Sequence, residues 1–302
     1  MRLNRKAYPI LSNGKDRIKN VISFKGSILN IKHFIENKGV NSSIFLITDQ
    51  NKFFNDMIIK ICNYAFDDSS QVKRVKRFER EISALKYANS KGCKNVIKIF
   101  HDEFIEIEGK KFQYYIMEKA DYTLTHLIEN KRLDISEKIR ICVQLLNALK
   151  ELHNLKIYHR DLKPDNILFF DNELKICDLG LMDCANEDFT LNSIDEVGEK
   201  IGPFGWLSPE AMNKFFTEGK ELEFTFDCNI DDKSDIYQLG KLFWYIFQAN
   251  LPEGIIDQRD FLINDNEIFS IISSMLYHNK IRRLALTSIQ EQFIPIQKRF
   301  IA

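Results

Sequence analysis

The chain has 302 residues, of which 44% are apolar, and its 43 basic residues balance its 43 acidic residues. This composition supports the buried core of a sizeable enzyme, and the net charge of zero provides no global attraction to nucleic acid or to an acidic membrane. No apolar run of about 18 residues and no apolar leader occurs, so we expect a cytoplasmic protein without a membrane span. Six cysteines without C-x-x-C spacing favour reduced thiols.

The N-terminal segment is locally basic. Its first 34 residues contain eight lysines and arginines, and Asp16 is the one acidic residue among them. The segment either binds an acidic partner or packs as an extension with its charges in solvent, and the second outcome is the more common one. We therefore expect residues 1–29 to form a basic extension ahead of the main fold.

The next segments predict a small sheet and a helix. Residues 35–47 and 57–62 have the apolar content of strands, and residues 75–88 have helical spacing. Lys60 is the one charged residue of the second strand, where an unpaired ammonium would be costly. Glu81 borders the apolar face of the helix, so we expect it to pair with Lys60.

Two further elements lead to the most informative part of the chain. Residues 112–117 predict a strand. Residues 136–155 predict a core helix with an apolar stripe, which comprises Ile139, Val143, Leu146, Leu149 and Leu152.

A β-hairpin follows that helix. Apolar runs at 167–170 and 174–177 flank a three-residue polar turn. Antiparallel pairing about the middle of this turn would place Asn166 opposite Asp178, with Cα atoms roughly 4.5–5.5 Å apart. Their amide and carboxylate oxygens suit Mg²⁺ better than Zn²⁺. Asp161, on the loop before Asn166, is placed to take a proton from a hydroxyl nucleophile.

This segment resembles the catalytic and metal-binding segments of eukaryotic-type protein kinases. The resemblance rests on HRDLKPDN at residues 159–166 and on DLG at residues 178–180. Lys163 is similar to the lysine of the serine/threonine-specific branch. The resemblance spans roughly residues 30–295 and implies an α+β kinase fold of two lobes. It implies a β-rich N-lobe at residues 30–118, a hinge at residues 119–121 and a helical C-lobe at residues 122–302.

The resemblance also implies the reaction and the residues that perform it. The γ-phosphoryl group of Mg-ATP would pass to a serine or threonine hydroxyl of a protein, and the chain itself is a candidate acceptor. The implied catalytic residues are Asp161, Lys163, Lys60 and Glu81, and the implied metal ligands are Asn166 and Asp178. Asp161 would accept the hydroxyl proton, Lys163 would steady the γ-phosphate, and Lys60 would hold the α- and β-phosphates.

The nucleotide pocket implied by the resemblance departs from the family pattern. Its residues would be Gly39, Ile44, Ile58, Lys60, Met117, Glu118, Ala120 and Leu168. Asn37 and Ser42 replace two of the three glycines of the phosphate loop, and Ile58 replaces a small alanine above the adenine. Pro203 replaces a threonine that bonds the catalytic aspartate. Two alternatives therefore stay open: a pseudokinase or nucleotide-binding interaction module, and an enzyme with a non-protein substrate or nucleotidyl transfer.

Three expectations concern the activation segment and its surroundings. Glu210 should pair with Arg282 or Arg283. Glu199 occupies the usual phosphosite register, and we hypothesise that it supplies a permanent negative charge to Arg160. The insertion at residues 214–230 is aromatic, so it either packs on the large lobe or docks a partner. The rings concerned are Phe215, Phe216, Phe224 and Phe226.

Overall fold

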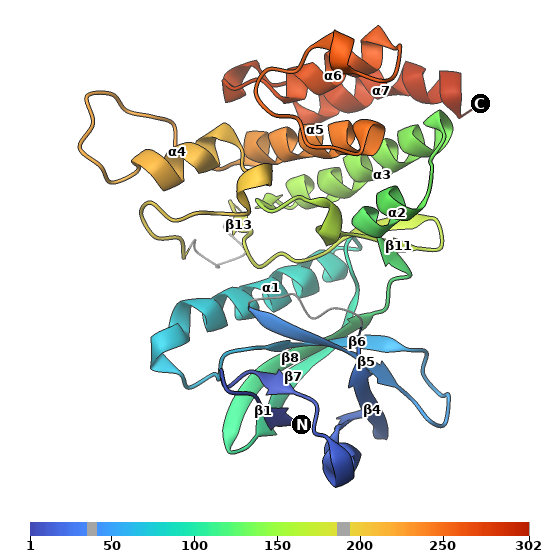
Figure 1. Cartoon of the computed structure of the whole chain (residues 1–302), viewed down its shortest axis with the longest axis vertical. Helices are drawn as coiled ribbons and strands as arrows, with labels where there is room; N and C mark the ends of the chain where they lie inside the picture. The colour runs from blue at the N-terminus through green and yellow to red at the C-terminus, as the bar shows by residue number, and fades with distance from the viewer. Residues whose placement is uncertain (35–40, 186–193, 302) are drawn as a thin grey trace. The chain divides into compact units, whose positions relative to one another are not determined.

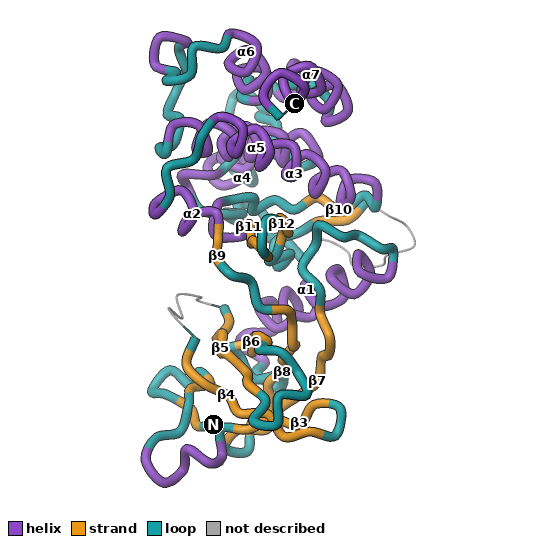
Figure 2. The backbone as a smooth tube through the Cα atoms, turned by 90° about the vertical axis from the view of Figure 1, so that its right-hand side faces the viewer, coloured by secondary structure: helices purple, strands orange, loops and turns teal. Residues whose placement is uncertain are grey.

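The fold consists of two compact units, seen in a computed structural model that describes residues 1–34, 41–185 and 194–301 (Figure 1). The N-terminal unit comprises Met1–Gly92 with Ile97–Lys119, and the C-terminal unit comprises Cys93–Val96 with Ala120–Ala302. Figure 2 shows that strands dominate the first unit and helices the second. The α+β class predicted from the sequence is therefore confirmed.

A six-stranded antiparallel sheet forms the N-terminal unit, in the order β3-β4-β5-β6-β8-β7. Its strands are β3 (Val21–Phe24), β4 (Ser27–His33), β5 (Ser42–Thr48), β6 (Met57–Cys62), β7 (Ile99–Ile107) and β8 (Lys110–Glu118). Helix α1 (Val72–Ser90) packs on β7 and β8, and β1 (Arg2–Leu3) pairs with β2 (Pro9–Ile10). Alternate residues of the sheet, such as Leu29, Ile31, Phe45 and Ile47, build the core.

The sheet begins earlier in the chain than predicted. We expected a strand over residues 35–47, but β4 ends at His33 and β5 begins at Ser42. Buried Leu29 and Ile31 alternate in β4 with the exposed Ile28 and Lys32 and the half-buried Asn30, as in a strand with one face on the core. The basic N-terminal segment thus supplies two strands of the sheet. Gly39 lies outside the described residues.

Helices build most of the C-terminal unit. They are α2 (Leu124–Asn130), α3 (Ile135–Asn154), α4 (Pro209–Thr217), α5 (Asp232–Gln248), α6 (Asn266–Met275) and α7 (Leu286–Phe300). A capping box of Asp134 and Glu137 begins α3, which packs against α5 and α7. The predicted stripe of α3 is buried except for Val143, which is half-buried. Among the described residues, no helix is long and apolar enough to span a membrane.

Short strands of the C-terminal unit carry the loops that matter for function. They are β9 (Tyr122–Thr123), β10 (Ile157–Tyr158), β11 (Ile167–Phe170), β12 (Glu173–Ile176) and β13 (Asp183–Cys184). β11 and β12 form the predicted hairpin, but Phe170 pairs with Glu173, so the turn has two residues and not three. Asp171 has a positive φ of 55°, as such a tight turn demands of one of its residues.

Candidate active site

The loop between β10 and β11 is held by the first turns of α5. The carboxylate of Asp235, which is fully buried, accepts the backbone N–H groups of His159 and Arg160, both at 2.8 Å. Gln238 accepts the N–H of Leu162 at 2.9 Å and donates to the carbonyl of Arg160 at 3.1 Å. Four hydrogen bonds from one helix therefore determine the backbone path through this loop.

The imidazole of His159 connects this loop to the segment after β12. Its Nδ1 accepts the backbone N–H of Asp161 at 3.2 Å, and its Nε2 lies 3.0 Å from the carbonyl oxygen of Cys177. A carbonyl can only accept, so Nε2 carries the proton and Nδ1 is the acceptor. The buried ring thus connects the backbone at Asp161 to the backbone at Cys177, and Asp178 is the next residue after Cys177.

The two carboxylate oxygens of Asp161 have different surroundings. Oδ2 accepts hydrogen bonds from the ammonium of Lys163 at 2.6 Å and from the side-chain amide of Asn166 at 3.1 Å. Oδ1 is buried and has no hydrogen-bond partner among the described residues. A buried acceptor without a donor is costly, so native proteins seldom contain one unless a ligand completes it. Oδ1 is therefore a ready acceptor for an incoming hydroxyl.

Burial dominates the electrostatics of Asp161. Loss of hydration raises the pKa of this carboxyl, the Lys163 ammonium opposes the rise, and the nearby Asp178 adds to it. Burial also acts to lower the pKa of Lys163, but the Asp161 carboxylate outweighs it and leaves the pKa of Lys163 raised. Lys163 therefore stays protonated at neutral pH and keeps a positive charge beside Asp161.

The register of the hairpin corrects the predicted facing of Asn166 and Asp178. The N–H of Cys177 donates to the carbonyl of Asn166 at 3.0 Å, so Cys177 lies opposite Asn166 and Asp178 follows one residue later. Asp178 has a positive φ of 63°, which turns the chain at this point. It still lies close enough to influence the pKa of both Asp161 and Lys163.

The donor chemistry of Asn166 and Asp178 fits Mg²⁺. The amide nitrogen of Asn166 already donates to the carbonyl of Asp161 at 2.8 Å, so its amide oxygen is the atom left for a cation. Mg²⁺ commonly takes one or two protein oxygens and completes its shell with water and phosphate oxygens. A carboxylate and an amide oxygen are therefore a sufficient protein contribution.

Lys60 and Glu81 meet inside the N-terminal unit. Nζ of Lys60, on β6, lies 2.7 Å from Oε1 of Glu81, on α1, and both side chains are buried. The hydroxyl of Tyr115 donates to the same Oε1 at 2.9 Å. The pairing expected from the amphipathic pattern of the helix is present, and it supplies the anionic partner that a buried ammonium needs.

The remaining described residues of the predicted nucleotide pocket lie in both units of the fold. In the N-terminal unit, Ile44 pairs with Lys60 across β5 and β6, and Ile58 pairs with Met117 across β6 and β8. The N–H of Glu118 is bonded to the carbonyl of Lys98 at 3.1 Å, so this N–H is already satisfied within the sheet. In the C-terminal unit, Ala120 is half-buried and Leu168 lies on β11.

Comparison with known proteins identifies the family. The model of the protein kinase domain family matches residues 38–297, which is most of the chain. The chain belongs to this family. The match confirms the resemblance based on HRDLKPDN and DLG, and it agrees with the α+β architecture.

Relatives of this kinase domain include several named protein kinases. Serine/threonine-protein kinase cds1 of Schizosaccharomyces pombe is 31% identical over 188 residues, or 61% of this chain and 36% of that protein. Dual specificity protein kinase TTK of the mouse is 25% identical over 82% of this chain and 27% of its own. A probable serine/threonine-protein kinase of Clostridium acetobutylicum is 26% identical over 75% of this chain and 31% of that protein. The chain thus spans about a third of the length of these relatives.

The end of the activation segment of the kinase domain is fastened by a buried ion pair. Glu210, at the start of α4, meets Arg283 at 2.7 and 3.1 Å, so Arg283 is its partner and not Arg282. Gly202 has a φ of 100°, and a Cβ there would lie 3.5 Å from Oδ1 of Asp161. The backbone at Gly202 therefore lies near Oδ1 of Asp161, and Pro203 is the next residue.

The acidic partners of Arg160 differ from our hypothesis. Its buried guanidinium pairs with Asp195 and lies 3.5 Å from Asp183. The carboxylate of Glu199 instead accepts the N–H of Glu196 at 3.0 Å. Asp195 therefore has the position expected of Glu199, because counting along a loop does not determine which acid turns inward.

The aromatic insertion divides into a packed part and an exposed part. Phe215 and Phe216, on α4, pack on Phe204 with ring centroids 5.5 and 6.4 Å apart. Phe224 and Phe226 are exposed in the loop that follows. Phe216 is itself exposed although it stacks on Phe204, so local packing accounts for the half-buried Phe215 and only in part for Phe216.

Proposed function

We propose that this kinase domain transfers the γ-phosphoryl group of ATP to serine or threonine hydroxyls of proteins. The single observation that carries this proposal is the asymmetry of Asp161, whose Oδ2 is held by Lys163 and Asn166 while its buried Oδ1 has no hydrogen-bond partner in the part of the chain that the structure describes. The chain belongs to the protein kinase family, and several of its relatives are named serine/threonine-protein kinases. Both facts support serine or threonine hydroxyls of proteins as the acceptors.

Asp161 positions the acceptor. Its free Oδ1 receives a hydrogen bond from the substrate hydroxyl and then the proton as the oxygen attacks phosphorus. The Lys163 ammonium, 2.6 Å from Oδ2, lies beside the reacting centre and offsets the negative charge of the transferring group. The hydrogen bonds from α5 keep this loop in place, so little reorganisation is needed during the reaction.

The other charged residues bind the nucleotide in this proposal. Asn166 would hold Mg²⁺ with its amide oxygen, and Asp178 with its carboxylate. When bound, Mg²⁺ neutralises phosphate charge and orients the phosphoryl group. Lys60 contacts the α- and β-phosphates, and Glu81 restricts where its ammonium can lie. A cytoplasmic location stays a prediction of the sequence.

An assay with ATP that is labelled at a known phosphate tests the reaction. The protein is incubated with Mg²⁺ and with ATP labelled at either the γ- or the α-position, together with a generic protein acceptor, and acid hydrolysis then identifies the labelled residue. Phosphoserine or phosphothreonine that carries γ-label is the expected result. Protein-bound α-label would replace the proposal with nucleotidyl transfer. Absence of both labels on protein at all enzyme concentrations would rule out protein kinase activity.

The ion pair of Arg160 with Asp195 should support activity by positioning the activation segment. Asp195→Asn is expected to lower kcat about tenfold, equivalent to about 1.4 kcal/mol in the transition state, because the buried guanidinium loses a charged partner. Glu199→Gln is the matched control, since it removes a carboxylate from the same segment. Steady-state phosphorylation of a protein acceptor measures both. A larger effect of Glu199→Gln would restore our original hypothesis.

A further inference from the structure

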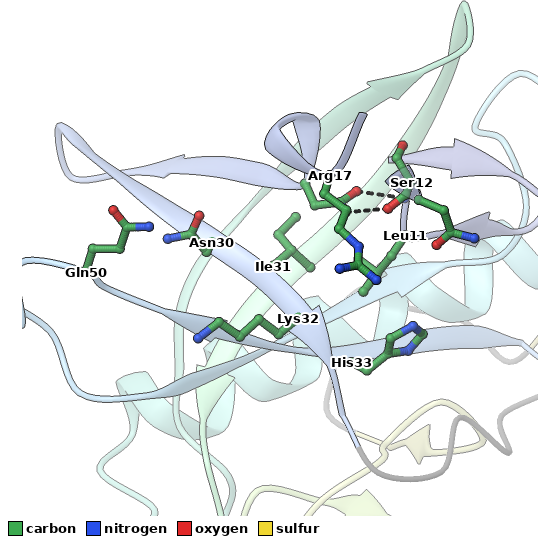
Figure 3. Close-up of a pocket in the computed structure, with 10 residues that line it drawn as sticks. Leu11, Ser12, Arg17, Asn30, Ile31, Lys32, His33 and Gln50 are labelled. Carbon is green, nitrogen blue, oxygen red and sulfur yellow. Dashed lines mark hydrogen bonds between the residues drawn. The ribbon is translucent and has the colours of Figure 1, made fainter. Parts of the chain in front are cut away.

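A polar pocket lies in the N-terminal unit where the basic segment crosses β4 (Figure 3). Its volume is about 380 Å³, and ten residues line it. Leu11 and Ile31, which are buried members of the core, contribute the apolar part of its lining. None of the residues proposed above to act on ATP or on the acceptor hydroxyl lines it, so it is a separate site.

The pocket has a rigid frame. The side chain of Asn20 accepts the N–H of Ser12 at 2.8 Å and donates to the carbonyl of Ser12 at 2.9 Å. The carbonyl of Asn20 in turn accepts the N–H of Ile31 at 2.8 Å. Ser12 and Asn20 are both buried, so these bonds are protected from water. They close the loop between the two residues and attach it to β4, which sets the position of Arg17 within that loop.

Three basic side chains reach the pocket from two directions. Figure 3 shows Arg17 extending from the closed loop, while Lys32 and His33 extend from β4 to either side of it. In the described part of the chain, these three side chains form no hydrogen bond or ion pair. They are exposed, so their donors are available to a ligand from solvent.

No acidic side chain among the described residues pairs with Arg17 or Lys32. Within the described residues, the lining includes no aspartate or glutamate. Asp16, beside Arg17 in the chain, pairs with Lys19 at 2.8 Å. Asp49, beside the lining residue Gln50, accepts the backbone N–H groups of Asn51, Phe53 and Phe54 at 2.9 to 3.3 Å. The pocket is therefore positively charged, with the amides of Asn13, Asn30 and Gln50 as further hydrogen-bonding groups.

We propose that this pocket binds a phosphate monoester. A guanidinium can bind two oxygens of a phosphate at once, and an ammonium adds a second positive charge to a dianion. The side-chain amides supply further N–H donors for the third oxygen. Among the lining residues none has a phenyl or indole ring for a nucleobase to stack on, which favours a phosphorylated side chain or a small phosphorylated compound over a nucleotide.

Isolated surface lysines seldom make a site, because water and mobile counterions satisfy them. Three features distinguish this pocket: its concave shape, its hydrogen-bonded frame and the absence of a carboxylate among its described lining residues. Together they give the pocket a positive potential, to which a divalent anion is attracted more than a monovalent one.

Titration with two probes at constant ionic strength tests the proposal. The probes are inorganic phosphate and a short blocked peptide that contains phosphoserine, and sulfate serves as the nonspecific anion. Binding is followed by the backbone and side-chain NMR signals of the N-terminal unit in the whole protein. Tighter binding of the peptide assigns the site to a phosphorylated protein segment, and tighter binding of inorganic phosphate assigns it to a small ligand.

Matched variants identify the pocket as the binding site. Arg17→Gln is expected to weaken phosphate binding roughly 10- to 100-fold, as expected for a lost charged hydrogen bond. Lys15→Gln removes the same charge from the same segment without touching the lining, and it should change binding less than about twofold. Equal losses in the two variants, or sulfate binding as tight as phosphate binding, would show a general attraction to the basic segment and overturn the proposal. Absence of any binding at millimolar phosphate would also overturn it.

Discussion

Asp161→Asn is expected to lower kcat for protein phosphorylation by about 10²- to 10⁴-fold, the range that a positioned general base contributes. The amide has nearly the shape of the carboxylate, but it cannot accept the proton of the hydroxyl nucleophile. Steady-state assays with a protein acceptor measure the loss, and nucleotide binding measured separately should change little. Asp165→Asn, an exposed carboxylate on the same loop, is the matched control and should retain activity within a few fold. Similar losses in both variants would contradict the role of Asp161.

The same variant has an expected effect on the pH dependence of stability. Burial raises the pKa of Asp161 in the folded protein above its value in the unfolded chain. The stability linked to this carboxyl is therefore fully present below the unfolded pKa and is lost as the pH rises through the folded pKa. The wild-type protein should thus gain stability relative to Asp161→Asn as the pH is lowered. Denaturant unfolding at several acidic pH values measures the free energy of unfolding of both proteins. If the difference between these free energies does not change with pH, the raised pKa of Asp161 is contradicted.

Lys60→Met is the second change with a large expected effect. It should abolish detectable phosphorylation and also lower the free energy of unfolding by about 3–5 kcal/mol, because the carboxylate of Glu81 stays buried without its ammonium partner. Denaturant unfolding and steady-state kinetics measure the two effects on the same preparation.

The double variant Lys60→Met with Glu81→Met separates the two roles of this ion pair. Removal of both charges should restore most of the lost stability, since an apolar pair of similar volume can replace a buried ion pair. Activity should remain absent, because the lysine is proposed to contact phosphate. If the double variant recovers activity together with stability, Lys60 has only a structural role.

Local patterns in the sequence were sufficient to predict much of this site. The cost of a buried charge required a partner for Lys60, and helical spacing identified that partner as Glu81. The alternation of apolar runs predicted the hairpin of β11 and β12, but its register was wrong by one residue. The turn uses two residues because Asp171 adopts a positive φ, and the sequence pattern did not indicate this.

Contacts between distant parts of the chain could not be predicted in this way. Asp235 and Gln238 hold the catalytic loop across sequence separations of 75 to 78 residues, and no local pattern links them to it. The first turns of α5 also contain Asp232, Lys233 and Ser234, so polar character alone did not indicate which side chains are buried and must have partners. The choice of Asp195 over Glu199 as partner of Arg160 likewise depends on the path of a loop, which periodicity does not describe.

The bonds from α5 to the catalytic loop also determine how this part of the protein opens. Because the amides of His159, Arg160 and Leu162 donate to side chains of α5, they become accessible to solvent only when that helix or the loop separates from its partner. Their hydrogen exchange should therefore be as slow as that of the interior of α5, unlike the fast exchange of ordinary loops. Exchange measured by NMR or mass spectrometry would then show the loop and the helix as one cooperative unit, so the reacting residues are as resistant to local unfolding as the core that supports them.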